Sequence, residues 1–311
     1  MNYPDRHSSV QRLTLKVSVI IPTWNRAPVL ARAIDSVRAQ TFAAWELIIV
    51  DDGSTDDTDS VCRRYLTDPR VRCQRIENQG VSAARNQGMR LARSQWFAFL
   101  DSDDAWMPAK LEKQFEKIAA TGDWICHTDE IWIRRGRRVN PMKKHQKPGG
   151  WIFEQCLPLC AISPSSSLVH RRVPDCIGDF DTEFDVCEDY EFWLRATAKY
   201  RVSLLDEPLI TKFGGHEDQL SRKYWGMDRW RVKALHARLQ DSDLRLEWRH
   251  AVADEILRKT EILMRGYRNN QRILEAGELQ EYWKGIRCWR EAAAAADPPP
   301  LPAVINRPIS K

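Results

Sequence analysis

Residues 96–104 read WFAFLDSDD, an apolar run that ends abruptly in three aspartates and a serine. A short apolar run bounded by polar residues is typical of a strand that is buried on both faces. Two earlier stretches have the same form, VSVIIPTWN at residues 17–25 and LIIVDDGS at residues 47–54. Segments with helical spacing separate these runs. The pattern therefore predicts an α/β fold with a mostly parallel central sheet flanked by helices.

The remaining segments extend this alternation along the chain. Pro28 suits the first turn of a helix, and Ser54 or Thr55 is expected to cap the next one. Arg135-Gly136 suggests a hairpin turn that leads into Val139. We expect helices over residues 27–40, 55–66, 81–93 and 188–198 and from Pro108 onward, and strands near residues 71–76, 124–133 and 202–210.

The composition excludes several classes of protein. The chain has 311 residues, 43% of them hydrophobic, and a formal net charge of +5. The small basic excess is spread along the chain, so binding to nucleic acid is not expected. No apolar run reaches the ~18–20 residues of a membrane span, and the first residues have no apolar signal-peptide core. Eight scattered cysteines without a CxxC pair indicate reduced thiols. The expected location is the cytoplasm, with at most peripheral contact at the inner face of the membrane.

Changes in composition along the chain predict four regions. Residues 1–15 are a flexible lead-in, residues 16–216 an α/β domain, residues 217–296 a helical C-terminal extension, and residues 297–311 a Pro-rich tail without a helix. The C-terminal helices are candidates for a homodimer contact or for contact with a membrane surface. The loop at residues 134–150 is strongly basic. It either binds an anionic acceptor or lipid phosphates or is simply solvated.

Two carboxylates flank Ser102 directly after a predicted strand. Alternate residues of an extended backbone face the same side, so Asp101 and Asp103 would repel each other unless a cation or a proton lies between them. Hard oxygen ligands suit Mg²⁺ or Mn²⁺. An Asp-rich turn that caps the following helix is the simpler alternative. The convergence of three polar strand ends at one edge favours a ligand site there.

Two further features lie downstream. Glu188 and Asp189 open a predicted helix, where they either complement the helix dipole or supply a general base held near the metal. His216 follows two glycines, whose backbone freedom could let the imidazole reach a metal. A lone loop histidine is also compatible with a plain surface position.

Together these residues resemble the pattern of glycosyltransferase family 2, which is built on the GT-A fold. The resemblance covers residues 16–216 and implies a nucleotide-diphosphate sugar donor (UDP-linked), a divalent cation, Mn²⁺ or Mg²⁺, and inversion at the anomeric carbon. The stretches that carry it are VSVIIPTWNR (17–26), AIDSVRAQTFAAWELIIVDDGSTDDT (33–58), NQGVSAARNQGMRLARSQWFAFLDSDDAWMPAKLEKQ (78–114) and EDYEFWLRA (188–196).

The resemblance also implies roles for individual residues. On the donor side, Pro22, Thr23 and Asn25 line the nucleotide pocket, and Asp52 accepts a hydrogen bond from the base. Arg85 lies near the nucleotide or its phosphates, and Asp101 and Ser102 approach the ribose or the metal shell. On the metal and acceptor side, Asp103 and His216 hold the metal, Asp189 is the base, Glu188 shapes the acceptor site, and Ser166 belongs to a loop that lines the donor sugar and acceptor. Trp24 and Trp106 lie beside these motifs as candidate pocket walls.

Two other functions are compatible with parts of this pattern. A non-catalytic nucleotide-sugar binding protein would tolerate loss of the base, and a sugar nucleotidyltransferase also uses strand-end carboxylates with a metal. The latter class typically has a Gly-rich phosphate loop near the N-terminus, and PTWNR (22–26) has no glycine. The acceptor stays open: a glycan, a lipid-linked molecule or another small molecule.

Overall fold

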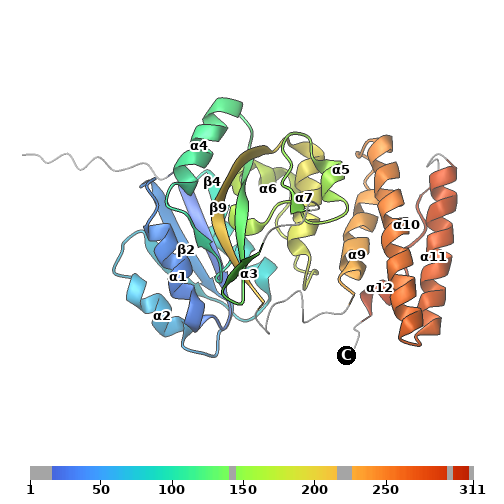
Figure 1. Ribbon diagram of the computed structural model, residues 1–311, viewed down its shortest axis with the longest axis horizontal. Coiled ribbons are helices and arrows are strands. Elements are labelled where there is room, and N and C mark those ends of the chain that lie inside the picture. Colours follow the sequence, from blue (N-terminus) through green and yellow to red (C-terminus); the bar gives the residue numbers. More distant parts are fainter. Residues whose placement is uncertain (1–15, 140–144, 216–225, 293–296, 308–311) are drawn as a thin grey trace, which may run out of the picture.

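The computed structural model describes residues 16–139, 145–215, 226–292 and 297–307 (Figure 1). Within these ranges, nine strands form a single sheet in the order β3-β2-β1-β4-β8-β6-β9-β5, with β7 paired to β6 at its side. His216 and the lead-in 1–15 lie outside the described residues.

One half of the sheet is the predicted parallel arrangement. The strands β3, β2, β1 and β4 run in the same direction, and the register places Val19 beside both Leu47 and Ala98. Its elements are β1 (Val17–Thr23), α1 (Ala27–Arg38), β2 (Trp45–Asp51), α2 (Thr58–Tyr65), β3 (Val71–Arg75), α3 (Val81–Leu91) and β4 (Trp96–Phe99).

The other half is mixed. The strand β8 is antiparallel to β4 and β6, whereas β9 runs parallel to β6. The register between β6 and β9 shifts around Asp129, because Thr128 pairs with Leu205 whereas Asp129 pairs with Pro208. Its elements are β5 (Ala105–Trp106), α4 (Lys110–Thr121), β6 (Ile125–Arg134), β7 (Arg137–Val139), α5 (Phe153–Cys156), η2 (Pro164–Ser166), β8 (Leu168–His170), α6 (Arg172–Ile177), α7 (Glu188–Lys199) and β9 (Ser203–Gly214).

Two apolar layers lie on the two faces of the sheet because successive strand residues point to opposite sides. Val19 and Ile21 face the layer that is shared with α1, α2 and α4. Ile20 faces the other layer, with α3 and α7. The helix α3 packs closely on this face, since a Cβ atom at Gly88 would collide with the side chain of Ile20.

The C-terminal helices continue the second apolar layer. They are α9 (Asp228–Leu239), α10 (Leu246–Asn269) and α11 (Ile273–Glu291), and they stand beside α5 and α7, at the end of the molecule away from α1 and α2 (Figure 1). The rings of Phe153 and Trp248 lie 4.8 Å apart across this junction. The buried Lys259 donates a 2.9 Å hydrogen bond to the carbonyl of Pro158 and pairs with Asp228 and Glu255. The extension therefore packs against α5 and the loop that follows it.

Two local expectations are wrong. Neither Ser54 nor Thr55 caps α2, which begins at Thr58 after Asp57, because the Ser54 hydroxyl instead accepts a hydrogen bond from the backbone of Asn25. The Pro-rich tail contains a short helix, α12 (Ala303–Asn306). Burial of Val304 and Ile305 in the apolar layer stabilises this helix, despite the prolines that precede it.

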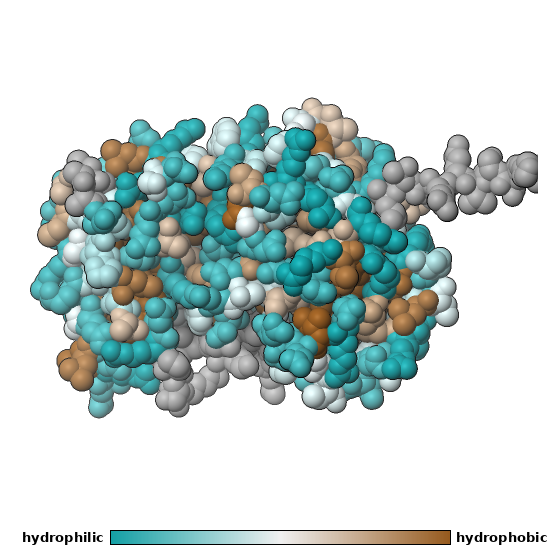
Figure 2. All heavy atoms as spheres, turned by 180° about the vertical axis from the view of Figure 1, so that it is seen from behind, coloured by the Kyte–Doolittle hydropathy of each residue, from teal (hydrophilic) through white to brown (hydrophobic). Residues whose placement is uncertain are grey.

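No helix in the described ranges is both long and apolar enough to cross a membrane. On the face seen in Figure 2, hydrophobic side chains lie in small groups among hydrophilic ones. This distribution is ordinary for a protein surface.

Candidate active site

The carboxyl ends of β1, β2 and β4 meet at one edge of the sheet because the three strands are parallel. The backbone N–H of Asp52 donates a 2.9 Å hydrogen bond to the carbonyl of Thr23, which joins the first two strand ends. Asp101 follows β4 at the same edge. The predicted convergence of the polar clusters is therefore present.

The loop after β1 is anchored by Asn25. Its backbone has a φ of 51°, in the left-handed region, and its side-chain oxygen accepts a 2.7 Å hydrogen bond from the N–H of Thr55. Pro22 and Thr23 are buried at the end of β1, and the Thr23 hydroxyl has no hydrogen-bond partner. A buried unpaired hydroxyl is costly unless a ligand satisfies it. Trp24 beside it is 47% exposed.

Asp52 fixes the start of α3. Its two carboxylate oxygens accept 2.8 Å hydrogen bonds from the N–H groups of Gln79 and Gly80. Burial raises the pKa of Asp52, while these two bonds oppose the rise. Each oxygen keeps a second lone pair, so the carboxylate can also accept a bond from a ligand.

Arg85 connects the acidic turn after β4 to the start of α7. Nη1 lies 2.6 Å from Oε1 of Glu188, and Nη2 lies 2.9 Å from Oδ1 of Asp101. The Arg85 side chain is 4% exposed. The guanidinium group is therefore held between two protein carboxylates at the edge where the strand ends meet.

The acidic turn is shaped by Ser165 from η2. The Ser165 hydroxyl donates a 2.6 Å hydrogen bond to Oδ2 of Asp104 and accepts a 3.1 Å bond from the N–H of Asp101. Burial raises the pKa of Asp104 to about 8, although Lys212 opposes the rise. Ser102, between Asp101 and Asp103, is 8% exposed.

The half-buried Asp103 carboxylate lies near a second carboxylate, that of Asp101. Burial raises its pKa, and the nearby Asp101 carboxylate raises it further. A divalent cation would remove both penalties, because it favours the ionised form of each carboxylate. In the described ranges no three His, Cys, Asp or Glu side chains gather as a complete metal site.

Lys212 is a site residue that the sequence analysis missed. It lies on β9 opposite Trp132 of β6. Burial lowers the pKa of Lys212, but the carboxylates of Asp104, Glu130, Asp101 and Asp189 together raise it above its ordinary value. In the sequence, Lys212 is marked only by its position near the end of a predicted strand. The pairing of β9 with β5 and β6 is what brings it close to these carboxylates.

The helix α7 begins with the predicted carboxylate pair. Cys187, just before it, has a φ of 63°, which is unfavourable for a residue with a Cβ atom. Glu188 is buried, and burial raises its pKa to about 7 against the pull of Arg85. Asp189 is half-buried, with Oδ1 accepting a 2.7 Å hydrogen bond from the N–H of Tyr190. Burial raises the pKa of the Cys160 thiol, and the charge of Asp189 raises it further. Cys160 is therefore a neighbour of the predicted base.

Two predicted positions differ from the structure. The Ser166 side chain is fully buried, and its hydroxyl donates a 2.8 Å hydrogen bond to the carbonyl of Ser163. The structure thus offers no surface of Ser166 to a ligand, and Ser165 is the serine that reaches the acidic turn. Trp106 belongs to the apolar core, where its Nε1 donates to the carbonyl of Ser165, and it forms no pocket wall.

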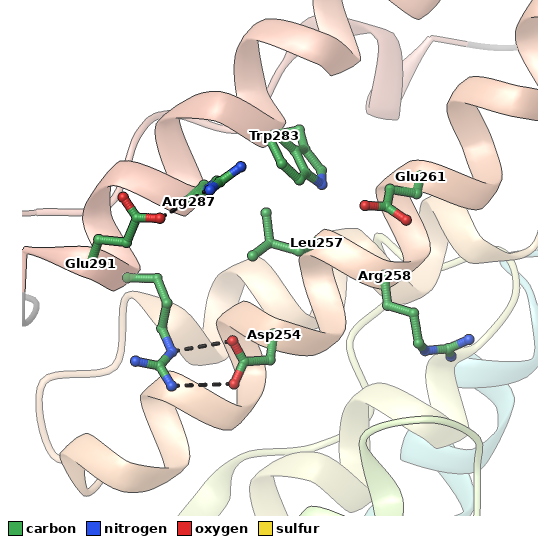
Figure 3. Close-up of a pocket in the computed structure, with 8 residues that line it drawn as sticks. Asp254, Leu257, Arg258, Glu261, Trp283, Arg287 and Glu291 are labelled. Atoms are coloured by element: carbon green, nitrogen blue, oxygen red, sulfur yellow. Dashed lines mark hydrogen bonds and ion pairs between the residues drawn. The ribbon is translucent and has the colours of Figure 1, made fainter.

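A separate groove of about 420 Å³ lies between α10 and α11. Leu257 and Trp283 line it from the two helices, and Arg287 is directed toward Glu291 (Figure 3). Arg290 pairs in the same way with Asp254, at 3.2 Å. None of the strand-end residues lines this groove.

The sheet, its acidic strand-end turn and the helix-borne carboxylates define a glycosyltransferase of the GT-A fold. The model of the family described as "Glycosyl transferase family 2" matches residues 18–157. The protein YwdF of Bacillus subtilis, an uncharacterized glycosyltransferase, is 31% identical over 60% of this chain and 70% of its own length. The chain belongs to glycosyl transferase family 2.

Other relatives and solved structures agree with this assignment. The β-1,3-glucosyltransferase WfgD of Escherichia coli is 29% identical over 61% of this chain and 73% of its own length. A Rickettsia felis glycosyltransferase is 37% identical over 48% of this chain, but the match covers only 25% of that protein. The structure of S. aureus TarS, residues 1–349, covers 90% of this chain and is itself covered to 89%, with a TM-score of 0.67 and 17% identity. At that identity the likeness concerns the fold alone.

Proposed function

We propose that this protein is an inverting glycosyltransferase that moves a sugar from a nucleotide-diphosphate sugar, with a UDP-linked donor expected, to an acceptor hydroxyl. The observation that carries the proposal is the double contact of Arg85 with Asp101 and Glu188. It holds the first turn of α7, which bears Asp189, against the acidic turn. Direct displacement of the diphosphate by the acceptor hydroxyl requires the bound donor and a base to lie close together.

The relatives support the choice of donor. The name of WfgD specifies UDP-Glc, and TarS was solved with UDP-GlcNAc. The mannosyltransferase PcManGT of Pyrobaculum calidifontis, with a TM-score of 0.59, was solved with GDP-Man and Mn²⁺. In this chain the unpaired Thr23 hydroxyl and the spare lone pairs of Asp52 are the groups that we assign to the nucleoside, with Pro22 and Asn25 shaping the loop.

Asp103 is the residue that we assign to a bound Mn²⁺ or Mg²⁺, with His216 as a proposed second ligand. When bound, the cation supplies Lewis-acid stabilisation of the diphosphate leaving group. We assign Lys212 to the same diphosphate, because its ammonium group adds positive charge beside the acidic turn. Asp101, held by Arg85, completes the acidic side of the donor site.

The remaining chemistry needs one base. Asp189 accepts the proton of the acceptor hydroxyl as its oxygen forms the new bond to the anomeric carbon. The bond from that carbon to the diphosphate oxygen breaks, and its electron pair leaves with the diphosphate. The leaving group needs no protonation, so a second catalytic carboxyl of the glycosidase type is unnecessary. Attack from the face opposite the leaving group inverts the anomeric centre.

We assign the acceptor to the glycans of cell-surface polysaccharide assembly. The name of WfgD specifies an acceptor linked to diphosphoundecaprenol, and the name of WcaA of Escherichia coli refers to colanic acid biosynthesis. We place the catalytic domain at residues 16–216, the helical extension at 217–296 and the tail at 297–311. Glu188 and the half-exposed Trp24 are the residues of this chain that we expect beside the bound substrates.

A donor screen tests this function directly. UDP-, GDP- and dTDP-sugars are added with Mn²⁺ in a thermal-shift assay, and the stabilising donor is then incubated with candidate acceptors. Release of the nucleoside diphosphate with a glycosylated product supports the proposal. Release of pyrophosphate would indicate a nucleotidyltransferase. Donor binding without release in the presence of every acceptor class would indicate a binding protein.

A further inference from the structure

A short hairpin between β6 and β7 carries four arginines. We call residues 134–138 the arginine hairpin; its charged members are Arg134, Arg135, Arg137 and Arg138, and all four are exposed. The two residues at its tip, Arg135 and Gly136, have φ values of 49° and 72°. Two successive positive φ values are those of the tight turn that matches the twist of a two-stranded ribbon. The turn therefore places the four side chains close together at an exposed tip.

These charges are not neutralised within the described part of the chain. No carboxylate there lies within 4.0 Å of a nitrogen of any of the four side chains, and the Arg134 guanidinium instead lies 5.2 Å from the ring centre of Trp132. Several exposed cations of the C-terminal helices are instead paired. Lys284 pairs with Glu281 at 2.8 Å, and Arg287 pairs with Glu291 at 2.9 Å. The arginine hairpin thus gathers four adjacent exposed cations that have no carboxylate partner in the described ranges.

The arginine hairpin lies at the same edge of the sheet as the acidic turn. Ile133 and Arg134 pair with Phe213 and Gly214 of β9, and the N–H of Phe213 donates a 3.2 Å hydrogen bond to Oδ1 of Asp104. Only β9 therefore separates the arginine hairpin from the acidic turn. Adjacent strands are about 4.8 Å apart. A surface that binds the hairpin would therefore face the open edge of the site.

We propose that the arginine hairpin binds the anionic headgroups of a lipid bilayer and orients the open edge of the active site toward that surface. Four clustered cations repel one another in solution, and a surface dense in phosphate removes that repulsion. All four side chains are exposed, so they can contact several headgroups at once rather than enclose a single ion. This inference goes beyond the proposed function and does not depend on the identity of the donor or acceptor.

Vesicle binding tests the proposal. The full chain is sedimented with vesicles of phosphatidylcholine alone or of phosphatidylcholine mixed with phosphatidylglycerol, without donor. We expect binding only to the anionic vesicles, and weaker binding as salt is raised. The variant Arg134→Gln/Arg137→Gln/Arg138→Gln should bind roughly 100-fold more weakly, from a contribution of about 1 kcal/mol per basic side chain near an anionic surface. Arg135 is kept, so that the turn itself is not changed.

A charge-matched control removes three paired cations instead. The variant Arg265→Gln/Lys284→Gln/Arg287→Gln loses the same net charge from α10 and α11 and should bind the anionic vesicles as the unaltered chain does. Equal melting temperatures of the two variants show that both are folded. Equal weakening by both variants, or tight binding by the hairpin variant, would overturn the proposal. Inorganic pyrophosphate is the second arm: release from vesicles by pyrophosphate, but not by sodium chloride of equal ionic strength, would reveal a discrete phosphate site and also contradict a bilayer surface.

Discussion

Nη1 of Arg85 donates a 2.6 Å hydrogen bond to Oε1 of Glu188, although 103 positions separate the two residues in the chain. The other end of the same guanidinium group holds Asp101 at 2.9 Å. Arg85 comes from α3, and the Asp52 carboxylate fixes the two residues, Gln79 and Gly80, directly before this helix. The end of β2 that carries Asp52, the acidic turn and the helix of the proposed base are therefore linked by side-chain contacts.

Replacing Arg85 should damage stability as well as activity. In Arg85→Gln, the carboxylates of Glu188 and Asp101 lose their shared cation, and breaking a buried ion pair costs about 3–5 kcal/mol. Denaturant unfolding should show this loss. The exposed Arg90 of the same helix is the matched control, and Arg90→Gln should change stability by less than about 0.5 kcal/mol.

A second variant tests whether Arg85→Gln lowers stability because it leaves carboxylates without their cation or because it disturbs packing. Arg85→Gln/Glu188→Gln removes one of the two stranded carboxylates, so we expect it to be more stable than Arg85→Gln alone. If the double variant is no more stable than the single one, the Arg85–Glu188 contact does not have the importance assigned to it.

Asp103 should control metal-dependent donor binding. In calorimetry with Mn²⁺, Asp103→Ala should bind the nucleoside diphosphate about 100-fold more weakly than the unaltered chain, because a metal ligand is lost. With EDTA present, the variant and the unaltered chain should bind alike. Asp185→Ala, which removes an exposed carboxylate before α7, should behave as the unaltered chain. Unchanged Mn²⁺ dependence in Asp103→Ala would show that the cation is held elsewhere.

Lys212 should affect the diphosphate and spare the nucleoside. Loss of a hydrogen bond to a charged group costs about 1.5–3 kcal/mol, so Lys212→Met should weaken UDP binding roughly 10- to 100-fold. Uridine binding should not change, and Lys212→Arg should restore much of the UDP affinity. Equal weakening of UDP and uridine would instead assign Lys212 a purely structural role beside Asp104 and Glu130.

Acid should destabilise the protein through a buried histidine. Burial lowers the pKa of His127 to about 4, and its Nε2 lies 2.7 Å from the carbonyl of Pro148. The unfolded chain binds a proton at this histidine below its ordinary pKa of about 6.5, while the folded chain does not. The contribution of His127 to stability is thus present above about pH 6.5 and lost as the pH falls toward 4.

The comparison with His127→Gln isolates this contribution. Between about pH 7.5 and pH 4, the unaltered chain should lose up to about 3 kcal/mol more of its free energy of unfolding than the variant. Guanidinium titrations at several pH values measure the difference. Parallel pH profiles for the two proteins would show that His127 does not titrate differently on folding.

The parts of the site that the sequence predicted lie at the ends of parallel strands. Thr23, Asp52 and Asp101 each follow an apolar run, and parallel strands must bring such ends to one edge. Local patterns carry this information. The start of α7 at Glu188 is confirmed, and it could also be predicted locally, from the helical spacing of the residues that follow it.

The parts that were missed depend on contacts between distant segments. Lys212 reaches the acids because β9 pairs with both β5 and β6, and no local pattern specifies that pairing. Ser165 rather than Ser166 contacts the acidic turn because of the rotation of the short η2 turn, which three identical serines leave undetermined. Arg85 could be predicted as a site residue, but its two carboxylate partners come from separate elements.

The most direct test of the account is the Asp189→Asn variant, measured with the donor found in the screen. We expect donor affinity by calorimetry to be unchanged, because Asp189 acts on the acceptor. Transfer should fall by roughly 10²- to 10⁴-fold, the usual contribution of a general base. Asp185→Asn, at an exposed position before the same helix, should retain full activity. Full turnover by Asp189→Asn would contradict the assignment of the base and, with it, the proposed mechanism.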